Sequence, residues 1–223
     1  MRFRFRLRTL LLAVLVLSLS LAMVAPRIQR SRREQAVVAQ IKRLGGDVYY
    51  HHEMSPDLNP GATPPGPAWF RAIFGEHCLA TVHTVWLQHF DVPAWKHPPL
   101  TDDQLKLLAP LSDLQAVMLD GSAITDDGLK YLMMHPLKEL HLGGTTISDK
   151  GVEQLRELQT LERLNLGGTK VTDASLEHIR TMRKLKWVHV GGTKVKAATI
   201  DEFNRANSRQ LVLDGRELGV ARP

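Results

Sequence analysis

The residues of this chain that could carry out chemistry are few, and they lie in its first hundred positions. Cys78 is the only cysteine, so the chain can form neither an intramolecular disulfide nor a cysteine-based zinc site. A thiol beside a histidine base can act as a nucleophile, and His77 and His83 are the candidate bases. A lone cysteine next to Leu79 is more typical of a small apolar core residue. We favour that interpretation and keep an enzyme acting through Cys78 and a nearby histidine as an alternative.

Possible metal ligands form a second cluster, His51-His52-Glu53. Together with His77 or His83 they could surround a metal ion. However, the spacing matches neither H-E-x-x-H nor any comparable zinc pattern. The sequence therefore predicts no metal site, no cofactor and no catalytic residues.

The elements that would position any functional residue come from an internal repeat. Residues 137–149 (LKELHLGGTTISD) recur almost unchanged at 161–173 (LERLNLGGTKVTD). Leu114, Leu137, Leu161 and Leu185 follow one another at intervals of 23, 24 and 24 residues. The interval from Val82 to Leu114 is longer, and its extra residues form a proline-containing insertion at 88–99. A fixed period of this length is the signature of a solenoid.

Each copy of the repeat predicts a strand, a tight turn and a helix. The L-x-x-L-x-L segment alternates apolar and other residues, which is typical of a short strand with one buried face. Apolar residues then recur about every three positions, as at Val152, Leu155 and Leu158, which indicates one face of a short helix. The Thr/Ser-Asp pair between them is predicted to cap the helix. No unit can bury its apolar side alone, so stacking must supply the core.

This pattern resembles the leucine-rich-repeat superfamily, in the T-x-[IV]-[TS]-D variant of small membrane-anchored bacterial repeat proteins. The resemblance covers roughly residues 81–215. It implies an α/β fold, a leucine-rich-repeat solenoid of about five strand–turn–helix units, which serves as a non-catalytic interaction module for a protein partner. Most members carry Asn or Cys in the turn, bonding along the stack. This chain has hydroxyls that could do the same, at Ser122, Thr145, Thr169 and Thr193.

The N-terminus predicts a membrane anchor. A basic tail, residues 1–8, precedes an uncharged run at 9–25, and Arg27 follows. The run reaches the lower limit of a bilayer span, about 17 residues, and exceeds a signal-peptide core of about 7–15. We therefore predict a single-pass transmembrane signal-anchor helix over 9–26, with the repeat domain on the extracytoplasmic side of the cell membrane. Cleavage after Ala22 is the alternative.

The charge distribution argues against nucleic acid as a partner. Residues 1–43 hold ten Lys or Arg and one Glu, a net charge of +9, while the whole chain carries +6. Residues 44–223 therefore carry −3, so the basic character belongs to the segments that flank the predicted anchor. Such segments match anionic headgroups, and the folded part is a poor match to phosphates.

A small adaptor, residues 27–80, is expected between anchor and repeats, as a juxtamembrane helix and a cap for the solenoid. The sequence predicts a short helix over 34–44, a β-prone stretch over 47–52 and an amphipathic segment over 67–74. We expect Trp69 and Phe74 of that last segment to cover the core of the first repeat. At the other end, residues 216–223 form a tail too short for a further unit.

The outward-facing residues of the strands form two columns that could bind a partner. Thr84, Ala116, Glu139, Arg163 and Trp187 make the first column, and Trp86, Met118, His141, Asn165 and His189 the second. The predicted binding residues are Trp86, Met118, Glu139, His141, Arg163, Asn165, Trp187 and His189, because Trp, Met, Arg and His together are typical of interfaces.

Two other interpretations of these columns stay open. An envelope glycan or cell-wall polymer could bind through the tryptophans and the histidine column. Alternatively, Trp86 and Trp187 could simply pack against the inserted loop and the terminal cap. Because His141 and His189 share one column, the sequence also predicts that binding weakens on acidification near a pKa of about 6.5.

Overall fold

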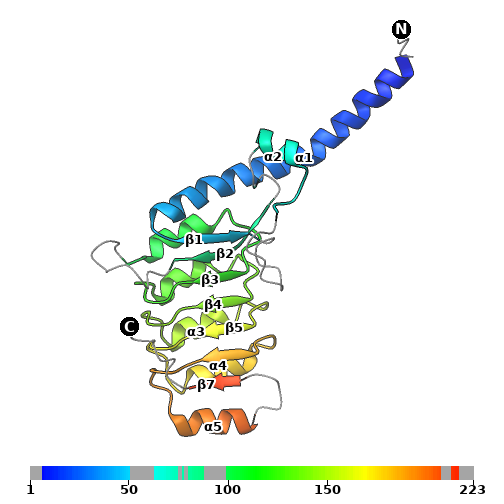
Figure 1. The fold of residues 1–223 in the computed structure, drawn as a ribbon. Coiled ribbons are helices and arrows are strands. Elements are labelled where there is room, and N and C mark those ends of the chain that lie inside the picture. Colours follow the sequence, from blue (N-terminus) through cyan, green and yellow to red (C-terminus); the bar gives the residue numbers. More distant parts are fainter. Residues whose placement is uncertain are drawn as a thin grey trace.

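The computed structural model describes residues 7–50, 63–74, 77, 80–87, 99–206 and 212–215. One seven-stranded sheet runs through them in the order β1 to β7 (Figure 1). Its strands are β1 (Asp47–Tyr50), β2 (Val82–Trp86), β3 (Ala116–Met118), β4 (Glu139–His141), β5 (Arg163–Asn165), β6 (Trp187–His189) and β7 (Val212–Asp214). All neighbours from β2 onward are parallel, whereas β1 pairs with β2 in the antiparallel sense.

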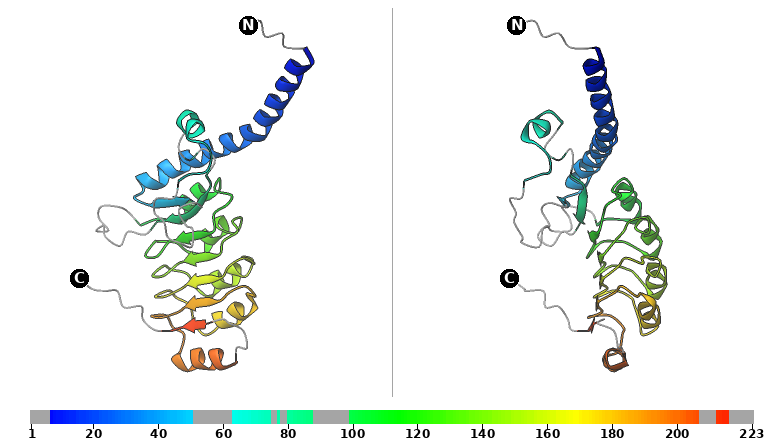
Figure 2. Two further views of the ribbon diagram at one scale, coloured as in Figure 1. Left: turned by 45° about the vertical axis from the view of Figure 1, so that its right-hand side comes forward. Right: turned by 90° about the vertical axis from the view of Figure 1, so that its right-hand side faces the viewer.

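Each parallel strand from β2 to β6 is followed by a short helix, so the predicted strand–turn–helix solenoid is confirmed. The helices are η2 (Asp102–Leu108) and η3 (Asp126–Tyr131), which are 3-10 helices, and α3 (Asp149–Leu155), α4 (Ser175–Thr181) and α5 (Ala197–Ala206). They all lie on one side of the sheet (Figure 2). β7 is the degenerate last copy of the repeat. We call the opposite side of β2–β7 the strand face.

The core lies between sheet and helices and is built from the repeating apolar positions. Leu140 and Leu142 of one repeat, and Leu164 and Leu166 of the next, have no exposed surface. Each fills the space between its own strand and the helix row, and each is matched by an equivalent residue one repeat away. The core is therefore continuous along the stack, as expected when no unit can fold alone.

The Thr and Ser residues of the turns act within their own repeat, contrary to the stacking role considered from the sequence. The Thr145 hydroxyl donates to the Leu142 carbonyl at 2.6 Å, and Thr169 does the same to Leu166. Backbone groups make the bonds along the stack instead, for example from Gly144 N to Gly167 O at 2.7 Å. The reason is the length of the side chain, since a short hydroxyl group lies closer to the carbonyl three residues back than to a carbonyl of the next turn.

The Thr/Ser-Asp pairs also do more than the predicted helix capping. Asp149 accepts hydrogen bonds from the backbone N–H and the hydroxyl of Thr172, one repeat later, at 2.8 and 2.7 Å. Asp102 binds Thr125 and Asp126 binds Ser148 in the same way. Each carboxylate thus joins two repeats. The capping prediction is wrong for Ser148, whose side chain makes no cap bond to α3.

The N-terminal edge of the solenoid is covered by α1 (Leu7–Arg43) and β1. The predicted short helix over 34–44 is the end of this longer helix, which continues through Pro26. Val37, Val38 and Ile41 of α1 are buried in the core. Their neighbour Glu34 is 3% exposed, pairs with Arg30 at 2.7 Å and accepts the Val82 N–H.

The prediction that Trp69 covers the first repeat is wrong. Trp69 belongs to α2 (Ala68–Phe74) and is 64% exposed. The reason is that α1 and β1 already occupy the edge that it was expected to cover. The side chain of Phe74 lies outside the described part of the structure.

None of the helices within the described ranges combines the length and the apolar character that a membrane crossing requires. Five further expectations fall wholly or largely on residues outside those ranges: the basic tail at 1–8, His51-His52-Glu53, Cys78, the inserted loop at 88–99 and the tail at 216–223.

Candidate functional site

The strand face carries the two predicted columns in the expected register. Glu139 of β4 lies opposite Arg163 of β5, which lies opposite Trp187 of β6. In the second column, Met118 pairs with His141, His141 with Asn165 and Asn165 with His189. The adjacency predicted from the repeat is therefore confirmed.

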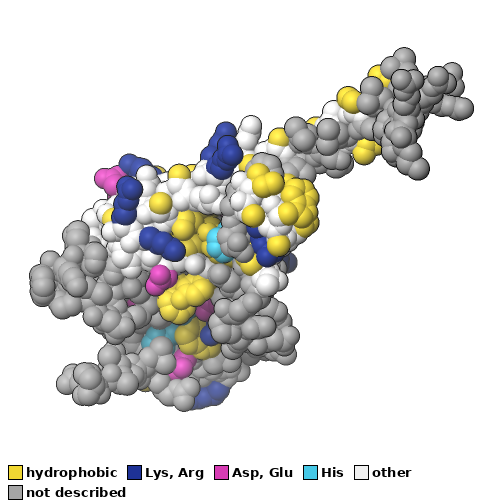
Figure 3. All heavy atoms as spheres, turned by 45° about the horizontal axis from the view of Figure 1, so that its top comes forward, with side chains coloured by type: hydrophobic (Ala, Val, Ile, Leu, Met, Phe, Trp, Pro, Cys, Tyr) yellow, Lys and Arg dark blue, Asp and Glu magenta, His cyan; other side chains and the backbone are white. Residues whose placement is uncertain are grey.

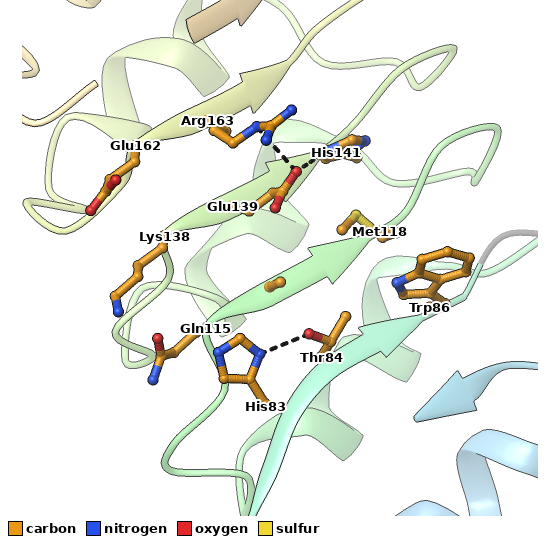
Figure 4. A pocket seen from close by; sticks show the side chains of 11 residues that line it. His83, Thr84, Trp86, Gln115, Met118, Lys138, Glu139, His141, Glu162 and Arg163 are labelled. Atoms are coloured by element: carbon orange, nitrogen blue, oxygen red, sulfur yellow. Dashed lines mark hydrogen bonds and ion pairs between the residues drawn. The ribbon is translucent and has the colours of Figure 1, made fainter. Parts of the chain in front are cut away.

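A hollow of about 540 Å³ lies on the strand face over β2 to β5 (Figure 4). Five of the eight predicted residues line it: Trp86, Met118, Glu139, His141 and Arg163. The other three, Asn165, Trp187 and His189, continue the columns beyond it. The hollow thus lies over the N-terminal repeats, where Thr84 and Ala116 are small outward-facing residues and leave room above them.

Several residues that line the hollow were not among those predicted. They are His83, Thr84, Gln115, Ala116, Lys138 and Glu162. Lys138 and Glu162 directly follow the lead leucines, Leu137 and Leu161, so they stand where the chain enters each strand. Their place in the repeat is visible in the sequence, but their approach to the strand face is not.

An ionic cluster occupies one side of the hollow. The Glu139 Oε1 atom lies 3.0 Å from His141 Nε2 and 3.4 Å from Arg163 Nε. The Arg163 guanidinium also lies over the Trp187 ring, 5.5 Å from its centroid. The Arg163 side chain nevertheless remains 57% exposed. It can therefore offer hydrogen-bond donors to a bound molecule.

Asp120 is a functional candidate that sequence reasoning missed. It stands where later repeats have glycine, at Gly143 and Gly167, and that departure was a usable signal. Its Oδ1 atom accepts from the Gly143 N–H at 2.6 Å and from Asn165 Nδ2 at 3.0 Å. Its Oδ2 atom lies 3.5 Å from His141 Nδ1. A Cβ at Gly143 would stand 2.6 Å from Asp120 Oδ1, so glycine makes room for this network.

The two histidines of the second column respond to their surroundings in opposite directions. Burial alone would lower the pKa of His141, but hydrogen bonds and charge from Asp120 and Glu139 outweigh it and raise the pKa to about 9. Burial lowers the pKa of His189, which is 3% exposed, and the Asp214 charge offsets this only in part. The predicted weakening of binding assumed two histidines with ordinary pKa values, whereas the pKa of His141 lies above that value and the pKa of His189 below it.

The aromatic residues of the face have partners of their own. The Trp86 ring lies 5.2 Å from that of Tyr49 on β1, and Trp187 stacks on His189 at 5.9 Å. Trp86 still exposes 43% of its surface. Packing against Tyr49 thus buries part of the Trp86 side chain, and the remaining exposed part can contact a partner.

The candidate bases near Cys78, His77 and His83, make packing and hydrogen-bond contacts with neighbouring side chains. His77 stacks on Tyr50 with ring centroids 4.0 Å apart, and His83 Nδ1 lies 2.9 Å from the Thr84 hydroxyl. Within the described ranges, no group of three or more His, Cys, Asp or Glu side chains could hold a metal ion.

Comparison with known proteins bears on the middle of the solenoid. Residues 134–155 and 157–179 each match the sequence model of a leucine-rich repeat. These two segments contain β4 with α3 and β5 with the start of α4, and the strand–turn–helix units on both sides continue the same stack.

Among solved structures, an internalin (inlF) from Listeria monocytogenes str. 4b F2365 is similar, with 23% sequence identity and a TM-score of 0.40. The match covers 49% of this chain and 30% of that one, so this chain spans less than a third of the internalin's length. A comparison with curated proteins found no match.

The stability of the solenoid is expected to fall as pH rises from about 6.5 to about 9. The His141 pKa of about 9 lies above the unfolded value of about 6.5. The protonated form therefore stabilises the fold fully below about pH 6.5, and this contribution, on the order of 3 kcal/mol, is lost as pH passes 9. Chemical denaturation at a series of pH values measures it. His141→Gln should flatten this part of the profile, and an equally steep slope in that variant would contradict the assignment.

Proposed function

We propose that this chain is a non-catalytic interaction module, tethered to a membrane through residues 9–26, that binds a protein partner on its strand face. The observation that carries the binding proposal is the hollow of about 540 Å³, bordered by exposed Trp86 and Arg163. Aromatic and arginine side chains are the residues that most often dominate protein binding. Leucine-rich repeats, which are extended stacks with one open face, suit that role.

The polar part of the hollow supports specificity. Glu139, His141 and Arg163 hold one another in place, so a partner meets an ordered set of charges. Trp86 and Met118 supply an apolar side next to it. Apolar contact with a few fixed polar groups is the combination that gives a site both affinity and orientation.

The binding experiment compares two matched pairs of alanine variants. The partner is first recovered by crosslinking the full-length protein in its native cells. Trp86→Ala and Arg163→Ala should each weaken binding by tenfold or more, since central anchors cost roughly 1.4 kcal/mol or above. Glu153→Ala and Glu177→Ala, exposed on the helix side, should bind as the unaltered chain does. Circular dichroism checks folding.

Two results would refute this proposal. Equal losses in both pairs, or losses only in the helix pair, would move the site off the strand face. Recovery of wall polymer in place of protein would instead favour the glycan alternative.

The tether is proposed from the uncharged run at 9–25 and from the exposure of its side chains. Leu11, Val14, Leu15 and Val16 are each more than half exposed on the part of α1 that projects from the solenoid (Figure 2). The T-x-[IV]-[TS]-D form of the repeats supports the same assignment, since it resembles membrane-anchored bacterial proteins. We place the repeat domain on the extracytoplasmic side, because four N-terminal arginines oppose translocation of the tail.

The tether predicts that the mature protein keeps its N-terminus. N-terminal sequencing of protein purified from membranes should start at or near Met1. A chain that starts at Met23 would show that the segment is a cleaved signal.

A further inference from the structure

α2 presents two apolar side chains largely to solvent. Trp69 is 64% exposed and Ile73 is 67% exposed. The two residues are four positions apart, so they share one face of the helix. Trp69 also makes an edge contact with Phe70, with ring centroids 5.6 Å apart. An exposed apolar face of this kind marks a surface that another medium or molecule covers.

The segment that leads into α2 lies near the part of α1 that follows the uncharged run. A cavity of about 370 Å³ is lined by Arg27, Arg30 and Ser31 of α1 together with Pro65, three residues before α2 begins. Arg71 of α2 donates to the carbonyls of Pro64 and Gly66, at 2.9 and 2.7 Å. The short segment before α2 thus lies near the turn of α1 that follows the uncharged run, and Arg71 ties α2 to that segment.

Basic side chains surround this position. Arg27, Arg32 and Arg33 of α1 are exposed. Figure 3 shows hydrophobic side chains gathered where α2 lies beside α1, with Lys and Arg side chains along the adjoining part of α1. Aromatic residues next to cationic ones, at the point where an apolar segment stops, are the arrangement that suits a lipid headgroup layer.

We propose that α2 is an interfacial helix, which lies on an anionic lipid surface and inserts Trp69 and Ile73 into its headgroup layer. The proposal rests on the tether proposed above, because α1 brings α2 to that surface. A short amphipathic helix gains from burying its apolar side chains at this depth and from cations that meet anionic lipids. With α1 it provides a second contact, so the solenoid has a fixed tilt and its strand face a fixed direction.

The test uses the full-length chain in vesicles of phosphatidylcholine and phosphatidylglycerol whose acyl chains carry bromine near the headgroup. Bromine quenches tryptophan at close range. The chain should float with the vesicles, and its fluorescence should be lower than in unbrominated vesicles. Trp69→Phe should remove most of this quenching, whereas Trp187→Phe, on distant β6, should preserve it. Brominated vesicles of phosphatidylcholine alone should quench the tryptophan fluorescence less than the anionic vesicles do.

A second variant keeps Trp69 and removes the apolar side chain of Ile73 from the same helix face. Ile73→Glu adds a negative charge at an exposed position, so the fold should persist by circular dichroism while quenching by the anionic vesicles falls severalfold. Flotation without quenching, or quenching unaffected by Trp69→Phe and Ile73→Glu, would overturn the interfacial role of α2 and leave the tether intact. A chain that does not float would overturn the tether, and the role of α2 with it.

Discussion

Replacement of Leu142 by alanine is expected to lower the free energy of unfolding by about 2–5 kcal/mol. Leu142 is fully buried immediately after β4, and the equivalent Leu166 is fully buried in the next repeat. Truncation removes apolar contacts and leaves a cavity that the stacked turns on either side cannot close, because backbone hydrogen bonds hold them at fixed spacing. Denaturant unfolding followed by circular dichroism gives the magnitude.

The matched control is Glu153→Ala, on the exposed surface of α3 in the same repeat, which should change stability by no more than about 0.5 kcal/mol. Because each repeat contacts only its neighbours, the double change at Leu142 and Leu166 should differ from the sum of the single changes. An unaltered unfolding transition in Leu142→Ala would mean that the assigned strand register is wrong.

Replacement of Gly46 by alanine should destabilise the N-terminal edge of the solenoid by about 1–3 kcal/mol. Gly46 lies between α1 and β1, where a Cβ would stand 2.6 Å from Leu87 Cδ2 and 2.7 Å from the Trp86 carbonyl oxygen. A side chain can change rotamer to relieve such a clash, but a backbone oxygen in a sheet cannot. The α1–β1 cap must therefore shift away from β2, and hydrogen exchange of the β1 amides should accelerate.

Gly121→Ala separates this steric effect from the usual cost of replacing glycine. Gly121 has a φ of 71° and no heavy atom within 4 Å of an added Cβ. Its replacement should cost about 1–2 kcal/mol through backbone strain alone and leave exchange in β1 unaffected. Slow β1 exchange in both variants would contradict the close packing around Gly46.

The repeat alone predicts which residues lie next to one another on the strand face. Once Leu140 and Leu164 are placed one period apart, their outward neighbours Glu139 and Arg163 must face each other across adjacent strands. A strand has a period of two, so a single register satisfies the apolar pattern. The composition of the columns followed from the sequence for the same reason.

The cap was less predictable, because several apolar segments could pack on the N-terminal edge of the sheet and the sequence does not show which of them does. The sequence offered both the helix that contains Ile41 and the segment that contains Trp69. Ile41 is 1% exposed and Trp69 is 64% exposed, so the helix and β1 cover the edge. Amphipathic patterning shows that a segment has an apolar face, but it does not show what that face meets.

The sequence by itself determined the stack of repeats, the columns on its open face and the acidic balance of the folded part, because these follow from period and composition. The tertiary structure decided where the hollow lies, that Asp120 and Glu139 hold His141 protonated, and that each repeat's aspartate bonds to the next repeat. The contacts of Asp120 with His141 and of Asp149 with Thr172 join residues 21 and 23 positions apart, at 3.5 and 2.8 Å. A hydrogen bond at that range depends on the exact rise and twist between neighbouring turns, which an apolar pattern leaves open.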